Sequence, residues 1–202
     1  GDLIVYKMRD ENGNGNFQSA DPGSFTWGLT SGNTSNAMGS GLTLNTGSYE
    51  VFENSLINYH FVGWYPNNED YSCDYLPDSN DNFVLPASVA VSDGETTEIT
   101  LCNARDTGWL RVNKVADTDG DGQYDSTNPQ EFKWGTASAT TNFDMGSSEQ
   151  LITGTYDVFE NEVEGYAFTG WFPGGAEEES RYSCTNLPEG SQYAQLPTSL
   201  AV

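Results

Sequence analysis

The stretch Gly47-Ser-Tyr-Glu-Val-Phe-Glu-Asn54 recurs in the second half of the chain as Gly154-Thr-Tyr-Asp-Val-Phe-Glu-Asn161. In each copy the tyrosine, the valine and the final glutamate occupy alternate positions, so they share one face of a β-strand. A shift of 107 residues also superposes Lys7 on Lys114. Self-similarity over such a long period predicts a repeated domain.

The alignment of the two copies predicts where the domains begin and end. The offset stays at 107 residues up to Pro66 and Pro173, and then becomes 111 because the second copy has four extra residues in an acidic loop. We expect a complete first domain over residues 1–106 and a second domain over residues 107–202. Val202 aligns with Val91, so we expect the second copy to lack its final strand, the counterpart of residues 98–103.

The composition predicts strands rather than helices. Val, Thr, Tyr and Phe recur in short alternating runs separated by Asn, Asp, Gly and Pro, and no stretch has a convincing helical period. The 202 residues include 22 Gly and 13% aromatic residues, and two domains of about 100 residues can each bury a core. We predict an all-β protein of two tandem Greek-key β-sandwiches.

The charge balance excludes several classes of partner. The chain has 7 Lys and Arg against 30 Asp and Glu, which gives a formal net charge of −23. Such a surface repels nucleic acid and anionic membranes but attracts divalent cations. The sequence shows no signal peptide and no apolar run long enough to span a bilayer. We expect an extracellular protein, at a cell surface or in a secreted filament, that neither binds nucleic acid nor inserts into a membrane.

The three cysteines fit the repeat. Cys73 and Cys102 lie in the complete copy and are predicted to form a disulfide, which indicates an oxidising compartment. Cys184 aligns with Cys73, and its expected partner belongs to the strand that the second copy lacks. We therefore expect Cys184 to be unpaired.

A run with the spacing of a calcium-binding loop follows each predicted first strand. In the second copy, oxygen-bearing side chains occupy positions 1, 3, 5, 7 and 9 of an EF-hand-like loop: Asp117, Asp119, Asp121, Gln123 and Asp125. The first copy has the same positions and position 12: Asp10, Asn12, Asn14, Asn16, Gln18 and Asp21. We expect Ca²⁺ to stiffen these turns, with weaker binding where amides replace carboxylates. The alternative is an Asx-rich turn that needs no metal.

Strand alternation places three polar residues in the core of the first copy. Lys7 shares a face with the apolar residues of the first strand, Glu53 with those of the repeated strand, and Asn103 with those of the last strand. Burial lowers the pKa of a lysine and raises that of a glutamate. A neutral amine can then attack the Asn side-chain carbonyl while the carboxyl group shuttles protons, which leaves an isopeptide bond and ammonia. The alternative is a buried Lys–Glu ion pair that the Asn amide satisfies.

These features resemble the Cna protein B-type or prealbumin-like domains of bacterial surface adhesins and pilins, and the calcium-binding B repeats of serine-aspartate surface proteins. The resemblance depends on a first strand that ends in Lys7 or Lys114, on Gly-x-Tyr-x-Val-x-Glu ending at Glu53 or Glu160, and on Asn103 in the last strand. It implies Ig-like or prealbumin-like sandwiches, and a Lys7–Asn103 isopeptide bond formed with help from Glu53. The second copy supplies only the lysine and the glutamate.

The sequence favours a structural function over an enzymatic one. His60, the single histidine, aligns with Ala167, so no nucleophile–histidine arrangement repeats, and we expect at most a single-turnover crosslinking reaction. We expect a stalk or filament segment of a surface protein that contacts neighbouring repeats or subunits. One alternative is an adhesin module that recognises a glycan or protein, with an aromatic platform around Trp64, Tyr65, Tyr71 and Tyr75. Another is a fibre subunit completed by a strand donated in trans. Against such a platform, we expect most of the repeated tryptophans to be core residues: Trp27, Trp64, Trp134 and Trp171.

Overall fold

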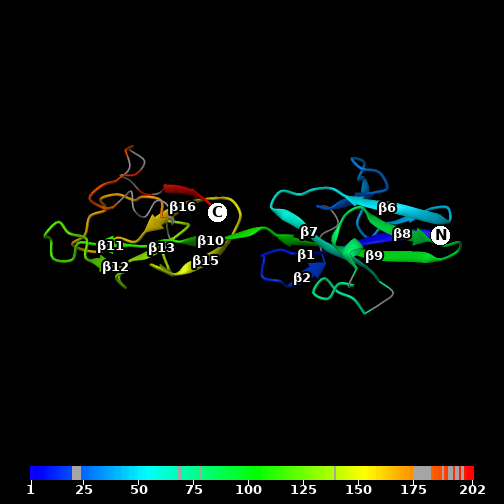
Figure 1. Cartoon of the computed structure of the whole chain (residues 1–202), viewed down its shortest axis with the longest axis horizontal. Coiled ribbons are helices and arrows are strands. Elements are labelled where there is room, and N and C mark those ends of the chain that lie inside the picture. The colour runs from blue at the N-terminus through cyan, green and yellow to red at the C-terminus, as the bar shows by residue number, and fades with distance from the viewer. Residues whose placement is uncertain are drawn as a thin grey trace. The chain divides into compact units, whose positions relative to one another are not determined.

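The chain is an all-β protein, as the composition predicts (Figure 1). The computed structural model describes residues 1–19, 24–67, 70–77, 79–138, 140–174, 183–187, 189–190, 193, 196 and 198–202. These residues form two compact units, Gly1–Thr107 and Gly108–Val202, called here the first and second units. No helix among the described residues is long and apolar enough to cross a membrane.

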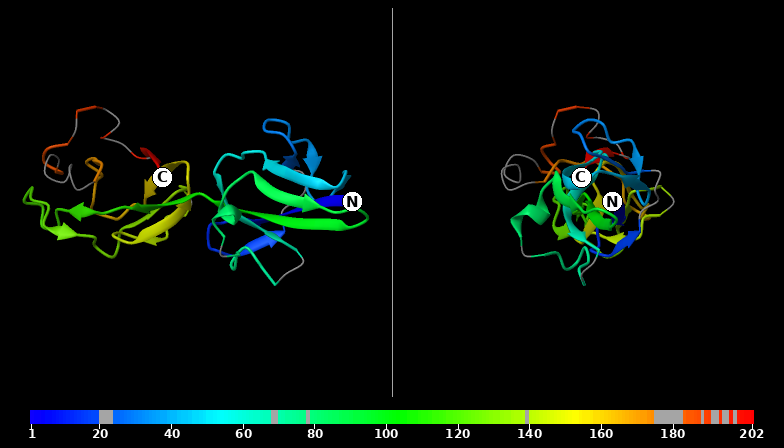
Figure 2. Two further views of the ribbon diagram at one scale, coloured as in Figure 1. Left: turned by 45° about the vertical axis from the view of Figure 1, so that its right-hand side comes forward. Right: turned by 90° about the vertical axis from the view of Figure 1, so that its right-hand side faces the viewer.

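The first unit contains two sheets that pack face to face as a β-sandwich (Figures 1 and 2). One sheet has the strand order β2-β1-β9-β7, with β5 also paired to β1. Its strands are β1 (Asp2–Asp10), β2 (Phe17–Ser19), β5 (Gly41–Thr43), β7 (Tyr59–Pro66) and β9 (Thr96–Arg105). The other sheet has the order β4-β3-β6-β8, formed by β3 (Thr26–Gly28), β4 (Asn36–Ala37), β6 (Gly47–Glu53) and β8 (Ala87–Val91).

The core of the first unit lies between these sheets. Leu3 and Val5 from one sheet, and Trp27 and Val51 from the other, are fully buried in one cluster. Leu3, Val5 and Val51 alternate with residues that are more exposed, so the period of two seen in the sequence matches the burial of these strands. Full burial of such a side chain stabilises the fold by about 1.5–3 kcal/mol.

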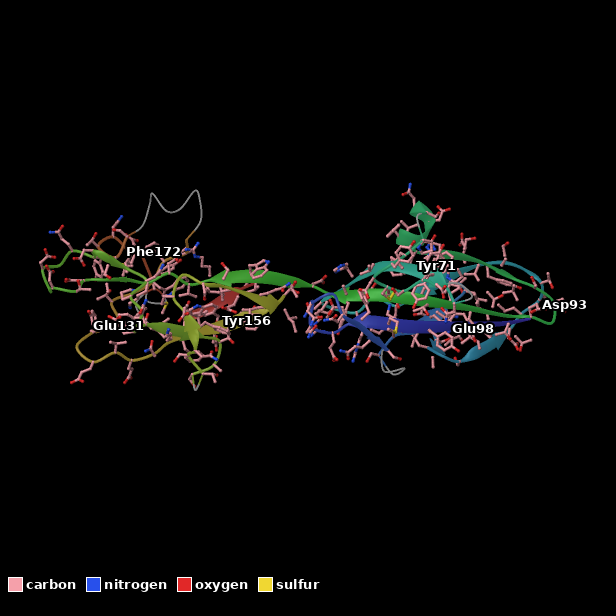
Figure 3. All side chains as sticks on the ribbon, turned by 90° about the horizontal axis from the view of Figure 1, so that it is seen from below. Tyr71, Asp93, Glu98, Glu131, Tyr156 and Phe172 are labelled. Atoms are coloured by element: carbon pink, nitrogen blue, oxygen red, sulfur yellow. A yellow bond between two sulfur atoms is a disulfide. The ribbon has the colours of Figure 1, made fainter. Side chains whose placement is uncertain are left out.

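Strand β9 is central to its sheet. It pairs in parallel with β1 from Asp2↔Thr96 to Asp10↔Ala104, and antiparallel with β7 on its other side. Five consecutive residues of β9, 99–103, are buried, so both faces of the strand are covered. A short turn that contains Asp93 connects β8 to β9 (Figure 3). The first and last strands of the unit are therefore direct neighbours.

The segment between β7 and β8 packs on the sheet and includes a short 3₁₀ helix, η1 (Asn80–Phe83). Buried Asn82 donates a side-chain hydrogen bond to the carbonyl oxygen of Trp64 at 2.9 Å. Gly63 allows this close approach, because a Cβ at that position would lie 2.3 Å from Leu76 Cδ1. The segment thus covers β7 and reaches β9, to which Cys73 joins it.

In the second unit, one sheet matches the first unit residue by residue. Its order is β14-β13-β16-β17, and the pair Trp134↔Glu160 corresponds to Trp27↔Glu53 at the offset of 107. These strands are β13 (Lys133–Gly135), β14 (Phe143–Asp144), β16 (Thr155–Glu160) and β17 (Thr198–Ala201). Phe132 and Trp134 are buried at the centre of its core.

The other sheet of the second unit is fragmentary in the described part of the chain. Two pairs are present, β10-β15 and β11-β12. Their strands are β10 (Thr107–Arg111), β11 (Val115–Ala116), β12 (Ser126–Thr127) and β15 (Ser148–Ile152). Residues 166–173, which align with β7, form no strand. Among the described residues of this unit, no strand occupies the place that β9 takes in the first unit.

Candidate functional site

The ammonium group of Lys7 lies inside the sandwich of the first unit. Lys7 follows Leu3 and Val5 on the inward face of β1 and is 3% exposed. Its Nζ lies 4.5 Å from the centroid of the Phe25 ring. The alternation that makes β1 a strand is thus also what brings a lysine into an apolar core.

Glu53 and Asn103 complete a three-residue cluster. Lys7 Nζ donates to Glu53 Oε1 at 2.6 Å and to Asn103 Oδ1 at 2.5 Å. Glu53 comes from β6 in the opposite sheet, and its side chain is 2% exposed. Asn103 comes from β9 and is also buried. The three residues that strand parity places in the core are therefore in direct contact.

Burial sets the protonation of this cluster. Desolvation lowers the pKa of Lys7 to about 8, against the opposing attraction of Glu53. Desolvation likewise raises the pKa of Glu53, against the charge of Lys7 and hydrogen bonds from Lys7 and Asn103. Both shifts favour the neutral pair relative to the same groups in water. The core therefore shifts the lysine toward its nucleophilic form.

The geometry places the reacting groups of an amide exchange together. The amine of Lys7 lies beside the side-chain amide of Asn103, and Glu53 contacts the amine. Attack of Nζ on Cγ of Asn103 forms a C–N bond, and loss of the Asn amide nitrogen as ammonia breaks one. The carboxyl group can take the proton from Nζ and deliver it to the departing nitrogen. The same contacts also describe a satisfied ion pair.

The second unit holds the lysine and glutamate in the same relation. Lys114 Nζ donates to both carboxylate oxygens of Glu160, at 2.8 and 3.0 Å, and lies 4.6 Å from the Phe132 ring centroid. The two side chains are 16% and 15% exposed, against 0% and 2% for Lys7 and Glu53. The Lys114–Glu160 pair is therefore more exposed than the Lys7–Glu53 pair.

The disulfide prediction is confirmed. Cys73 and Cys102 are bonded, with their Cα atoms 5.7 Å apart (Figure 3). The bond ties the segment after β7 to the central strand β9. Among the described residues Cys184 is the free cysteine and is half-buried, and burial raises the pKa of its thiol.

The loop after β1 is closed by hydrogen bonds from its own backbone. Asp10 is buried, and its Oδ1 accepts from the amides of Asn12, Gly13 and Asn14 while Oδ2 accepts from Gly15. Further along, Asn14 Oδ1 accepts from the amide of Asn16, and Gln18 lies exposed in β2. Asp21 lies outside the described residues. The geometry in this unit is that of an Asx turn.

The matching loop of the second unit gathers carboxylates. Ligand atoms of Asp117, Asp119 and Asp121 all lie within 4.8 Å of one another. Asp117 accepts from the amides of Gly120 and Gly122, and these backbone hydrogen bonds lower its pKa. Asp125 accepts from the Thr118 hydroxyl, and Asp121 accepts from the amide of Gln123. The oxygen donors suit Ca²⁺, because hard cations take carboxylate ligands at such loops.

The aromatic residues divide between the core and the surface. Trp27, Trp64 and Trp134 are buried, as predicted, whereas Trp171 is half-buried. Because Trp64 is buried, it cannot belong to an exposed aromatic platform. Tyr75 is 68% exposed and lies 6.0 Å from Tyr71 between ring centroids.

Sequence reasoning missed one part of the site and one ion pair outside it. Phe25 and Phe132 form the apolar wall beside each lysine, and their repetition at the offset of 107 was the available signal. His60 Nδ1 lies 2.6 Å from Asp106 Oδ1 at the exposed end of the first unit. The alignment gave no reason to pair these two residues.

Comparison with models of protein families, with curated proteins and with solved structures gave no match.

Proposed function

We propose that the chain is a structural segment of an extracellular stalk or filament, in which a Lys7–Asn103 isopeptide bond joins the first and last strands of the first unit. The contact of Lys7 with both Glu53 and Asn103 in a buried cluster is the observation that carries this proposal. The reaction that forms this bond occurs once per domain and uses no external substrate. The resemblance of the sequence to Cna protein B-type domains of surface adhesins supports the same proposal.

The topology gives such a bond a mechanical role. Strands β1 and β9 are parallel neighbours, so tension applied at Gly1 and Thr107 shears their ladder. With Lys7 joined to Asn103, tension passes from residues 1–7 through the crosslink to residues 103–107. Residues 8–102, which include the disulfide and the core residues outside β1, then lie outside the path of the force. A crosslink between residues 96 positions apart also stabilises the unit by ~4.7 kcal/mol on the chain-entropy model.

Calcium binding belongs to the same proposal and is assigned to the second unit. Asp117, Asp119 and Asp121 would hold the ion and neutralise a local excess of negative charge. The ion supplies rigidity and no chemistry. The net charge of −23 and the disulfide fit an exterior that contains calcium and is oxidising.

A ligand-binding adhesin module is the second candidate, favoured by apolar side chains on the segment between β7 and β8. Tyr75, Phe83 and Val84 are all exposed there. A glycan or protein ligand would bury these side chains, and a stalk segment does not need them.

Intact-mass measurement under reducing conditions tests the main proposal. Loss of ammonia lowers the mass of the chain by ~17 Da relative to its sequence. Glu53→Gln should restore the full mass because proton transfer is lost. The matched control Glu50→Gln changes an exposed carboxylate on the same strand, β6, and should keep the loss. An unshifted wild-type mass would remove the covalent bond from the proposal.

A further inference from the structure

Exposed apolar side chains gather on the segment between β7 and β8 in the first unit. Three of them are at least half exposed: Tyr75 (68%), Phe83 (50%) and Val84 (55%). Leu76 and Asn82, the neighbours of Tyr75 and Phe83 in sequence, both approach Gly63. A Cβ at this glycine would lie 2.3 Å from Leu76 Cδ1 and 2.8 Å from the backbone oxygen of Asn82. The exposed residues therefore belong to one small region beside η1.

The second copy of the repeat does not retain these side chains. Residues 71–86 align without a gap with residues 182–197, and both copies keep the framework Tyr-Ser-Cys-x-x-Leu-Pro and a final Leu-Pro. The exposed positions differ: Thr185, Asn186, Gln192, Ala194 and Gln195 stand where the first copy has Asp74, Tyr75, Asp81, Phe83 and Val84. The exposed apolar groups are thus specific to the first unit, and such groups on a soluble domain mark interaction sites where they gather.

The same segment carries carboxylates but no basic side chain. Asp74 and Asp81 are both exposed beside the apolar residues. The sequence contains no Lys or Arg between Arg9 and Arg105. Arg9 is paired with a glutamate, and the guanidinium group of Arg105 lies over a tyrosine ring. The surface is therefore negatively charged as well as aromatic.

Several contacts hold this segment against the sheet. Cys73 is bonded to Cys102 in β9, and the indole of Trp64 donates to the backbone oxygen of Asp81 at 3.0 Å. The side chain of Asn82 donates in return to the backbone oxygen of Trp64 at 2.9 Å. A segment held in this way loses less conformational freedom when it binds a ligand, so it can present its exposed side chains at a smaller entropic cost.

We propose that this acidic aromatic surface, formed by Asp74, Tyr75, Asp81, Phe83 and Val84, binds a basic segment of another protein. Arginine or lysine side chains of that segment pair with the two carboxylates and lie over the aromatic rings. Its aliphatic side chains cover the exposed valine. The inference rests on the second candidate function, ligand recognition by an adhesin module, and it needs no isopeptide bond in the core.

Two features favour a polypeptide over a glycan or a small cation. The side chains of Phe83 and Val84 have no polar atom with which to bind a sugar hydroxyl, and a neutral glycan leaves the charges of Asp74 and Asp81 without a counter-charge. A small cation neutralises the carboxylates but leaves the apolar side chains in water. Only a ligand with both basic and apolar side chains satisfies the whole surface.

Selection from a library of short random peptides tests the chemistry of the ligand. Peptides are selected on the full chain and counter-selected on a triple variant, Tyr75→Asn, Phe83→Ala and Val84→Gln. This variant takes the residues of the second copy and keeps the net charge. We expect the enriched sequences to combine Arg or Lys with aliphatic or aromatic residues. Enrichment of acidic or uncharged sequences, or no enrichment at all, overturns the proposal.

Fluorescence anisotropy with a selected peptide separates specific binding from attraction to the net charge. The triple variant should bind at least ~30-fold more weakly, as expected for the loss of aromatic anchors at an interface. Asp74→Asn with Asp81→Asn should also weaken binding and reduce its dependence on salt. The matched control, Asp93→Asn with Glu95→Gln, removes the same charge at an exposed turn that lies away from Tyr71 (Figure 3), and should leave the affinity nearly unchanged. An equal loss in the control overturns the proposal.

Hydroxyl-radical footprinting of the wild-type chain locates the peptide without any substitution, so it remains decisive if a variant fails to fold. The bound peptide should lower the oxidation of Tyr75 and Phe83 and leave that of Trp109, which is exposed in the second unit, unchanged. Unchanged oxidation of Tyr75 and Phe83 overturns the proposal. A glycan that protects these residues would keep the recognition function but overturn the basic ligand, and self-association through them would assign the surface to a second copy of this chain and overturn it as well. The intact mass of the same sample reports on the isopeptide bond alone.

Discussion

Replacing Asn103 by alanine should increase the contour length that the first unit gains when it unfolds under a pulling force. In the proposed crosslinked unit, an amide between Lys7 and Asn103 shields from tension the chain between these two residues, which are 96 positions apart. Asn103→Ala removes the carbonyl that Lys7 attacks, so this interval becomes extensible when the unit unfolds. Fully extended chain spans about 3.4 Å per residue, so a 96-residue loop adds about 330 Å of contour length.

The disulfide reduces that length by a known amount. Cys73 and Cys102 are 29 residues apart inside the shielded interval, so the extra step in the oxidised variant should be about 230 Å. Reduction should restore the step to about 330 Å. Single-molecule force–extension curves of the full chain, held at both ends, measure these steps.

The second unit provides an internal reference, because its own unfolding step should be the same in the wild type and the variant. Glu50→Gln is the matched control, and its curves should equal those of the wild type. A wild-type chain that already shows the step of about 230 Å would refute the shielding argument. An Asn103→Ala chain without any extra step would refute it equally.

Three further measurements test the electrostatics, the disulfide and the calcium site. In Asn103→Ala, Lys7 keeps a free amine whose pKa is lowered to about 8 from 10.5, so between these values the unfolded chain binds more protons than the folded chain. The free energy of unfolding in urea should therefore rise with pH over that interval, and Lys7→Met in the same background should abolish the rise. Replacing Cys73 and Cys102 by serine should lower the free energy of unfolding of the first unit by ~3.5 kcal/mol, since the bond closes a 29-residue interval; a loss below ~1 kcal/mol contradicts this estimate. Calcium should raise the melting temperature of the second unit and Asp119→Asn should weaken that effect, whereas an unchanged melting curve after chelation would argue against a bound ion.

Strand parity made much of the candidate site predictable. Lys7 lies two positions after Val5, and a strand that buries one must bury the other. The same reasoning brought Glu53 inward with Val51. These inferences depend only on local geometry and on comparison of the two copies.

Other features depend on packing between distant segments. Strand β9 is buried on both faces because the segment after β7 covers it, although alternation alone leaves one face for solvent. The loops after the first strands differ for a local reason. Asp10 and Asp117 accept matching backbone hydrogen bonds, but Asn12 and Asn14 stand where the second loop has the carboxylates of Asp119 and Asp121.

Periodicity and internal repetition can be read directly from the chain, and they predict the all-β class, the disulfide and the inward direction of Lys7. The parallel pairing of β1 with β9 follows from the fold instead, and it brings Lys7 and Asn103 into contact and puts their ladder in the path of a pulling force. Strand order arises from contacts between residues far apart in the chain, and no local pattern encodes it.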